Sequence, residues 1–238
     1  MKKKTVLITG VSRGIGKTLA LYFSEKGWNV CGCYKTNKPD YELPNAKFFQ
    51  CDISKRGEVK ALLQNAQEAF GSLNCVINNA GITADKTIFK MTDEMWESVI
   101  QTNLNGTFYM LKEAVKIMMK QRSDDDEARS IINIASVSAL KSYFGVANYS
   151  ASKAGVIALT KTAAREAGRF GITVNAVLPG FHQTDMGNSA GKNYIEKVKE
   201  ESVLNATTDI KELSEFILLL AGMKTVSGQV FNIDSRII

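Results

Sequence analysis

Residues 5–16 read Thr5-Val6-Leu7-Ile8-Thr9-Gly10-Val11-Ser12-Arg13-Gly14-Ile15-Gly16. The run before the first glycine is apolar and β-branched, which predicts a buried strand, and the residues from position 14 onward follow a helical pattern. A strand that turns sharply into a helix directs free N–H groups and the positive end of the helix dipole at one point. Because the glycines also leave room for a diphosphate beside the backbone, this stretch predicts an anion-binding turn.

The rest of the chain repeats this alternation of strand and helix. We expect strands at 5–9, 29–34, 46–51, 74–78, 130–135, 173–178 and 229–233, with helices near 14–27, 55–70, 92–121, 148–170 and 209–221. Strands that are near-continuous apolar runs between helices indicate a parallel sheet covered on both faces. Right-handed crossovers then predict a doubly wound α/β (Rossmann) fold with seven parallel strands. Since no linker or repeat divides the chain, we expect one domain over residues 1–238.

The composition excludes several classes of protein. The 238 residues include 30 basic and 24 acidic ones, for a net charge of +6, and 45% are apolar, as in ordinary globular proteins. Three positive charges are Lys2, Lys3 and Lys4, and the others form no concentrated stripe of the kind that binds nucleic acid. No apolar run approaches the ~20 residues of a membrane span, and the run at 6–8 is too short for a signal peptide. We expect a cytoplasmic protein that binds neither nucleic acid nor membranes.

The cysteines do not suggest a metal site. Cys31, Cys33, Cys51 and Cys75 fall in apolar, strand-like segments. The C-x-C pair lacks the second pair, or the histidines, that a zinc site requires. We expect reduced cysteines in the core and no bound metal.

The end of the second strand indicates which dinucleotide the turn would bind. Folds that bind NAD commonly place an acidic residue there to hold the ribose 2′-hydroxyl. Here the sequence has Lys35 and Lys38, with no acid before Asp40. A carboxylate would repel the 2′-phosphate of NADP, whereas Lys35 and Arg13 would attract it. We therefore expect NADPH or NADP rather than NAD; the alternative is that the two lysines are solvated loop residues.

A second set of residues suggests proton transfer. Tyr149 and Lys153 stand four residues apart, so on a helix both side chains share one face. A phenol transfers protons poorly at pH 7 unless its anion is stabilised by about 4 kcal/mol, and a neighbouring ammonium supplies much of this in a partly dry site. Ser136 ends an apolar strand, where open α/β sheets bind ligands, and we favour it over Ser138. Asn103 lies within a helical pattern that disfavours asparagine, which suggests a polar task rather than a solvated position.

Together these residues resemble the short-chain dehydrogenase/reductase family, in its branch of single-domain enzymes of about 250 residues. The resemblance covers essentially the whole chain and rests on Thr9-Gly10-x-x-x-Gly14-x-Gly16, Asp52, Asn78-Asn79-Ala80-Gly81, Asn103, Ser136, Tyr149-x-x-x-Lys153, Pro179-Gly180 and Thr184. Any one motif is weak, but the set in this order is specific.

The resemblance implies a role for each catalytic candidate. Tyr149 would deliver a proton to a carbonyl oxygen as hydride leaves the nicotinamide. Lys153 would lower the pKa of Tyr149 and bind the nicotinamide ribose. Ser136 would hydrogen-bond the substrate oxygen, and Asn103 would hold a water that links Lys153 to solvent.

The resemblance also implies a cofactor site. Asp52 would lie at the adenine, Asn79 near the adenosine ribose, and Thr184 at the carboxamide. The full implied set is Gly10, Ser12, Arg13, Gly14, Ile15, Gly16, Lys35, Asp52, Ile53, Asn79, Ala80, Gly81, Tyr149, Lys153, Pro179, Gly180 and Thr184. Residues from Asp185 to about position 208 would form a substrate lid. His182, just before it, either touches substrate or is a solvated loop residue.

The most similar subgroup is the 3-oxoacyl-[acyl-carrier-protein] reductases, which implies NADPH-dependent reduction of a 3-oxoacyl thioester on a carrier protein or CoA. Several departures leave alternatives open, namely another ketone or secondary alcohol, or a dinucleotide-binding sensor without activity. Phe170 stands where carrier-protein reductases tend to have arginine, and the acids at 124–127 would repel an acidic carrier. Asp234 is followed by Ser235-Arg236 instead of Gly-Gly, at an end that contacts other subunits in the family. We expect a homodimer or homotetramer.

Overall fold

The computed structural model describes residues 3–121, 127–141, 143–182 and 192–236 of the chain. Its strands are β1 (Thr5–Thr9), β2 (Asn29–Tyr34), β3 (Ala46–Gln50), β4 (Cys75–Asn78), β5 (Arg129–Ile134), β6 (Ile172–Leu178) and β7 (Val230–Asn232). All pairings between them are parallel, and the order across the sheet is β3-β2-β1-β4-β5-β6-β7. The predicted seven-stranded, doubly wound α/β fold is confirmed, as a single domain.

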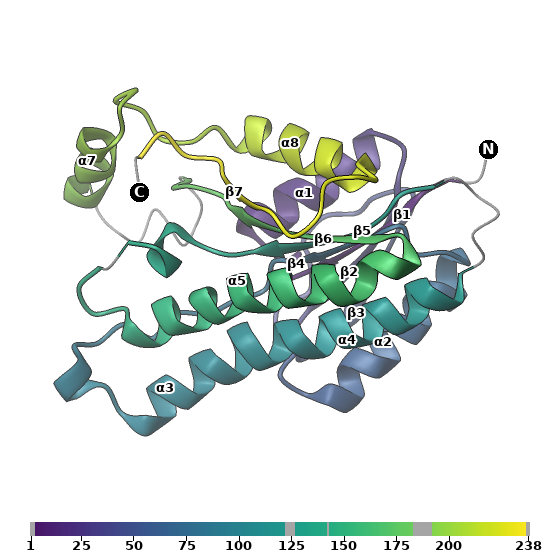
Figure 1. Ribbon diagram of the computed structural model, residues 1–238, viewed down its shortest axis with the longest axis horizontal. Coiled ribbons are helices and arrows are strands. Elements are labelled where there is room, and N and C mark those ends of the chain that lie inside the picture. Colours follow the sequence, from purple (N-terminus) through teal and green to yellow (C-terminus); the bar gives the residue numbers. More distant parts are fainter. Residues whose placement is uncertain (1–2, 122–126, 142, 183–191, 237–238) are drawn as a thin grey trace.

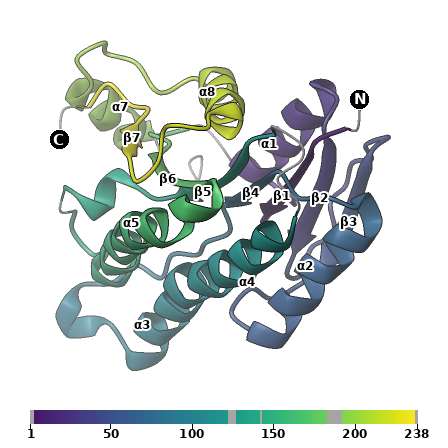
Figure 2. The same ribbon diagram turned by 45° about the vertical axis from the view of Figure 1, so that its right-hand side comes forward.

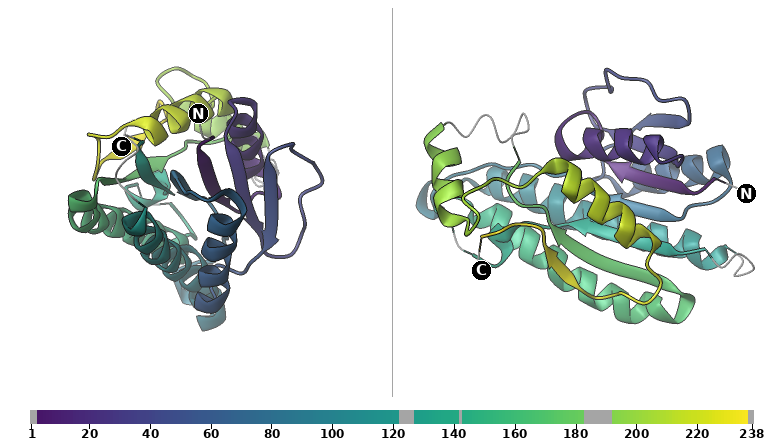
Figure 3. Two further views of the ribbon diagram at one scale, coloured as in Figure 1. Left: turned by 90° about the vertical axis from the view of Figure 1, so that its right-hand side faces the viewer. Right: turned by 90° about the horizontal axis from the view of Figure 1, so that it is seen from above.

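Helices cover both faces of the sheet (Figures 1 and 2). They are α1 (Gly14–Glu25), α2 (Arg56–Phe70), α3 (Asp93–Val99), α4 (Gly106–Lys120), α5 (Ala147–Ala167), α7 (Lys192–Glu201) and α8 (Ile210–Gly222). Helices α1 and α8 lie side by side on one face, where Figure 3 shows them from above. Helices α2, α4 and α5 cover the opposite face.

The two faces of the sheet have separate apolar cores because side chains alternate along each strand. Leu7 of β1 packs with residues of α2 and α4, whereas its neighbours Val6 and Ile8 pack with Leu19 of α1 and Ile217 of α8. Parallel pairing also brings the carboxyl ends of all strands to one edge. In Figure 1 this edge lies on the side of α7, away from the amino terminus.

The structure corrects two expectations about secondary structure. The segment expected as one helix at 92–121 is interrupted by a π-helical turn over Ile100–Asn105, between α3 and α4. Helix α7 falls in the part of the chain expected as a lid, for which no helix was predicted. The cysteines are buried and free, as predicted, and none of the described helices is long and apolar enough to span a membrane.

Candidate active site

The glycine-rich turn joins β1 to α1 at the carboxyl edge of the sheet. Gly10 has a φ of +75°, and a Cβ at Gly16 would lie 2.1 Å from the carbonyl oxygen of Gly10, so helix and turn pack without space for side chains. Arg13 makes no side-chain cap hydrogen bond, and the first turn of α1 contains no acidic residue. By contrast, α3 and α8 are capped by Thr92 and Asp209. An uncapped, acid-free helix start beside bare backbone suits a diphosphate.

Thr9 and Asn79 hold this turn in place. The Thr9 hydroxyl oxygen accepts hydrogen bonds from the backbone N–H groups of Asn79 and Ala80, both at 3.0 Å. The Asn79 amide donates to the carbonyl oxygens of Thr9 at 2.9 Å and Gly10 at 3.3 Å. Asn79 therefore fastens the glycine turn to the end of β4. Thr9 was not predicted as a site residue, although it stands in the quoted motif.

The ends of β2 and β3 carry the residues expected at the adenosine. Lys35 Nζ lies 2.8 Å from Asp52 Oδ2, and the N–H and hydroxyl of Ser54 donate to Asp52 Oδ1. Partial burial raises the pKa of Asp52, but Lys35 and Ser54 together hold it below its ordinary value. The side chain of Ile53 packs against Gly106 at the start of α4. Lys35 is thus ion-paired in this structure, although its side chain remains 63% exposed.

The loop after β2 lies against the glycine turn. The Ser12 hydroxyl donates to the carbonyl oxygen of Asn37. Asp40, the first acid of this loop, pairs with Lys17 of α1 at 2.7 Å, and the Lys17 ammonium lowers the pKa of Asp40. Since its charge is compensated, Asp40 offers little repulsion to a phosphate at this place.

Lys153 and Tyr149 lie on one face of α5, as their spacing predicts. Lys153 is 4% exposed, and its Nζ donates to the Ile134 carbonyl oxygen, 2.7 Å away at the end of β5. Burial lowers the pKa of the Lys153 ammonium to about 8. Its Nζ lies 5.7 Å from the ring centroid of Tyr149, which is half-buried. Lys153 is therefore still mainly a cation at pH 7, close to the phenol that it would influence.

Asn103 lies in the π-helical turn and is fully buried. Its Oδ1 accepts the Ile82 N–H at 2.8 Å, and its Nδ2 donates to the Ile82 carbonyl at 2.9 Å and to Ser152 Oγ at 3.2 Å. A Cβ placed on Gly81 would lie 3.2 Å from Asn103 Oδ1 and 3.6 Å from Lys153 Nζ. The side chains of Asn103 and Lys153 therefore both lie beside the backbone at Gly81. Such π-turns occur often at functional sites.

Two buried polar residues that were not predicted as site residues fix the start of α5. The Asn148 amide donates to the carbonyl oxygens of Ala84 at 2.9 Å and Met95 at 3.1 Å, and its Oδ1 accepts the Tyr149 N–H at 2.8 Å. Ser152 donates to the Tyr149 carbonyl at 2.7 Å. Both lie close to Tyr149 in the sequence, and this proximity was the only feature that could have indicated their role. They set the position from which the tyrosine side chain projects.

Ser136 follows β5 at the carboxyl edge, as expected. Its Oγ accepts the N–H of Ser138 at 3.2 Å and caps a short 3-10 turn over Val137–Ala139. The two hydroxyl oxygens are 3.3 Å apart. Lys153 binds the carbonyl of Ile134, two residues earlier, so β5 brings the serine and the lysine to one end of the sheet.

The loop after β6 carries the last expected cofactor residues. Pro179 is buried and Gly180 has a φ of +79°. Thr184 and residues 185–191 of the expected lid lie outside the described residues.

The expectation of a solvated histidine is wrong, because His182 is 6% exposed and its ring nitrogens lie between two backbone carbonyl oxygens.

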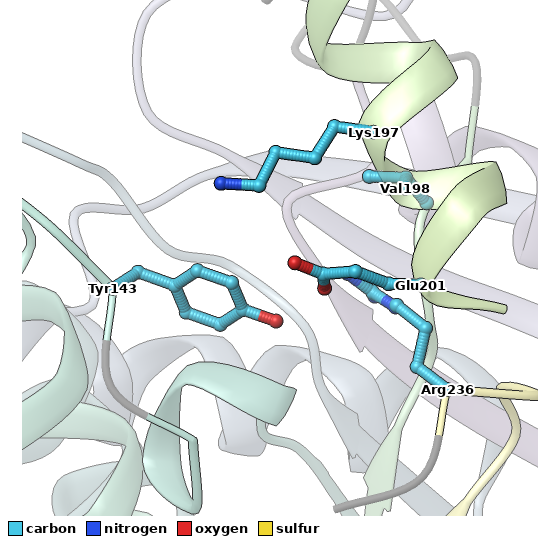
Figure 4. A pocket seen from close by; sticks show the side chains of 5 residues that line it. All are labelled: Tyr143, Lys197, Val198, Glu201 and Arg236. Atoms are coloured by element: carbon cyan, nitrogen blue, oxygen red, sulfur yellow. The ribbon is translucent and has the colours of Figure 1, made fainter.

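Helix α7, which lies in the expected lid, contacts other parts of the molecule. Figure 4 shows a small pocket between α7, the loop after β5 and the C-terminal segment, lined by Tyr143, Lys197, Val198, Glu201 and Arg236. Glu201 pairs with Lys141 at 3.1 Å. Ser235 accepts the Val203 N–H at 3.2 Å, and buried Arg236 pairs with Asp234. The unusual end of the sequence thus folds back onto its own chain.

The arrangement supports proton transfer beside a dinucleotide. The glycine turn, the Lys35–Asp52 pair and the Pro179–Gly180 turn lie at the same edge of the sheet as Ser136, Tyr149 and Lys153. Among the described residues, no group of three or more His, Cys, Asp or Glu side chains is placed to hold a metal ion.

The chain is similar to known reductases in sequence and to dinucleotide-bound proteins in structure. Residues 4–195 match the family model described as short chain dehydrogenase. The chain is 36% identical to 3-oxoacyl-[acyl-carrier-protein] reductase FabG of Staphylococcus epidermidis over 242 residues, which cover 97% of each chain. The solved structure of ElxO with NADP bound is similar at a TM-score of 0.88 with 29% identity, over 98% of each chain. A variant of actinorhodin polyketide ketoreductase with NADPH has a TM-score of 0.87 and 27% identity, over 98% of this chain and 96% of that one.

Proposed function

Because this chain belongs to the short-chain dehydrogenase family and is an NAD(P)-dependent oxidoreductase, we propose that it uses NADPH to reduce a 3-oxoacyl thioester to the secondary alcohol. The observation that carries the chemistry is the buried Lys153 ammonium, held by the Ile134 carbonyl and 5.7 Å from the Tyr149 ring centroid. The thioester is favoured by 36% identity to a 3-oxoacyl reductase over nearly the whole chain.

Each side chain of the site has a distinct task in this proposal. When bound, the reduced nicotinamide supplies the hydride. Tyr149 donates its phenolic proton to the carbonyl oxygen, and the Lys153 ammonium stabilises the phenolate that remains. Ser136 donates a hydrogen bond to the same oxygen, where negative charge develops. Asn103 holds a water through which Tyr149 and Lys153 recover a proton from solvent.

The chain's own residues would hold the cofactor along the carboxyl edge of the sheet. The diphosphate would be held at the α1 N-terminus, the adenosine by Asp52 and Ile53, and the nicotinamide by Pro179, Gly180 and Thr184. Lys153 and Tyr149 would contact the nicotinamide ribose. The remaining contacts would come from Gly10, Ser12, Arg13, Gly14, Ile15, Gly16, Lys35, Asn79, Ala80 and Gly81.

We expect the preference for NADPH over NADH to depend on Arg13 and Lys35. Replacing either residue by alanine should weaken NADPH binding about tenfold, because a charge-assisted hydrogen bond to the 2′-phosphate is lost. NADH has no such phosphate, so its Kd should change less than about twofold. Fluorescence titration with both dinucleotides measures the two constants.

Lys47→Ala is the matched control, because Lys47 is an exposed lysine near the amino end of β3. It should leave both constants unchanged. Equal losses for NADPH and NADH in the Arg13 and Lys35 variants would reject the phosphate assignment.

The substrate is tested by NADPH consumption with acetoacetyl-CoA, 3-oxoacyl carrier protein, sugars and cyclic ketones. The proposal predicts the highest kcat/KM for the two thioesters. A preference for a cyclic ketone would support the second candidate, reduction of another ketone such as a polyketide, which the similarity to a polyketide ketoreductase favours. Turnover of CoA but not carrier-protein thioesters would agree with the acids at 124–127, which oppose an acidic carrier.

We further propose that α4 and α5 form a contact between subunits in a homodimer or homotetramer. The two helices are neighbours on one face of the sheet (Figure 2). Phe108 and Met119 of α4 are 41% and 42% exposed, and α5 exposes the alanines at 151, 154 and 158. Exposed apolar side chains beside a stripe of small residues suit close packing against a second copy.

Analytical ultracentrifugation at micromolar concentration should show a dimer or tetramer for the wild type. Phe108→Glu should shift it to smaller species, because a charge would be buried in the contact. Leu21→Glu is the control, since Leu21 is equally exposed but lies on α1, across the sheet. A wild-type monomer would contradict the proposed contact.

A further inference from the structure

The single histidine of the chain joins two distant stretches of backbone. His182 Nε2 lies 2.6 Å from the Pro179 carbonyl oxygen, and Nδ1 lies 3.1 Å from the Thr208 carbonyl oxygen. Pro179 directly follows β6, and Thr208 lies two residues before α8. The imidazole ring therefore links the backbone before the segment that contains α7 to the backbone after it.

The backbone around this ring is tightly packed. A Cβ on Gly180 would lie 2.0 Å from Thr208 Oγ1 and 2.8 Å from the Ile233 carbonyl oxygen. The Thr208 hydroxyl donates to that carbonyl at 3.2 Å. The turn after β6, the segment before α8 and the end of β7 thus meet without space for another side chain, and a shift of one would move the others.

We propose that His182 is a positioning residue, which fixes the Pro179–Gly180 turn against Thr208 and thereby shapes the nicotinamide end of the cofactor site. This inference rests on the proposed function, because it takes the turn to be the place where the nicotinamide binds. His182 acts through the backbone and does not itself contact a reacting atom.

The protonation state of the ring determines which contact is a hydrogen bond. Burial lowers the pKa of His182, although the carbonyls of Pro179 and Thr208 and the carboxylates of Asp234 and Asp209 raise it. A neutral ring has one N–H, and the shorter distance places it on Nε2. We expect Nε2–H to donate to Pro179 at neutral pH, while the Thr208 contact becomes a hydrogen bond only when the ring is protonated.

The test compares the Kd for NADPH with the Kd for a ligand that contains only the adenosine part of the cofactor. His182→Leu removes the donor, and we expect it to weaken NADPH binding about tenfold, as for one lost hydrogen bond. Adenosine 2′,5′-bisphosphate lacks the nicotinamide, so its Kd should stay within about twofold. His182→Gln restores an N–H donor and should recover most of the NADPH affinity. Unchanged NADPH binding in His182→Leu, or equal loss for both ligands, would overturn the proposal.

A measurement on the wild type remains informative if the variants fold poorly. Because the chain has one histidine, ¹H–¹⁵N spectra of the imidazole need no assignment. We expect the Nε2–H tautomer at pH 7.5 and titration below the pH of a solvated histidine. The Nδ1–H tautomer would exclude the proposed hydrogen bond, and ordinary titration would show that the ring is not buried as described. If the wild type bound neither NADPH nor the bisphosphate, the proposed function would fail, while the spectra would still decide the state of His182.

Discussion

Replacing Tyr149 by phenylalanine should lower kcat for carbonyl reduction by about a thousandfold, the usual contribution of a positioned general acid. The phenol is the only group of the proposed site that donates a proton to the substrate oxygen. The ring and its packing remain in the variant, so the Kd for NADPH should stay within about threefold. Steady-state kinetics with the best thioester, together with NADPH titration, measure both quantities.

Tyr22→Phe is the matched control, because Tyr22 lies on α1, on the other face of the sheet from α5. It removes the same hydroxyl and should leave kcat unchanged. Near-normal turnover in Tyr149→Phe would remove Tyr149 from the proposed role and leave the proton donor to be sought elsewhere.

Replacing Lys153 by methionine should have two opposite effects. We expect kcat to fall by at least about a hundredfold, because the phenolate of Tyr149 loses its neighbouring cation. We also expect the free energy of unfolding at pH 7 to rise, since methionine fills a similar volume without the cost of burying a charge. Activity assays and urea unfolding of the apoprotein test the two effects.

The pH dependence follows from the lowered pKa of Lys153, about 8 in the folded protein. Between pH 8 and the unfolded value of about 10.4, the unfolded chain binds more protons, so folding stability rises with pH over that window. Below pH 8 the buried ammonium lowers the free energy of unfolding by about 3 kcal/mol. The variant avoids this cost, but it loses stability because the Ile134 carbonyl no longer has its hydrogen-bond donor. We expect the variant to be more stable than the wild type by about 1–2 kcal/mol at pH 7. This difference should reach zero between pH 8 and pH 10 and then reverse, because the neutral amine of the wild type still donates to the Ile134 carbonyl.

Lys161→Met is the control for both effects, because Lys161 is an exposed lysine two turns further along α5. It should change neither kcat nor the pH dependence of stability. A stability difference between the wild type and the Lys153 variant that is constant from pH 7 to 10 would show that the ammonium is not buried as described.

The sequence predicted the strands well because their signals are local. A mainly apolar run such as Ile131–Ile134 is typical of a strand covered by helices on both faces of the sheet. It can be recognised without knowledge of residues far away in the sequence. The Tyr149–Lys153 pair was predictable for the same reason, since one helical turn places both side chains on one face. Helix α7 was missed because its charged sequence has the low apolar content expected of a surface loop.

The sequence by itself determined the succession of strands along the chain, the glycine turn and the spacing of the proton-transfer pair, because these follow from the periodicity and backbone preferences of short segments. Only the tertiary structure decided which partners the polar side chains meet. Asn103 binds the backbone of Ile82, Lys35 pairs with Asp52, and His182 lies between two carbonyl oxygens 29 residues apart. The physical reason is that parallel pairing gathers loops from the whole chain at one edge of the sheet, where contacts depend on distances in space that leave no pattern in the sequence.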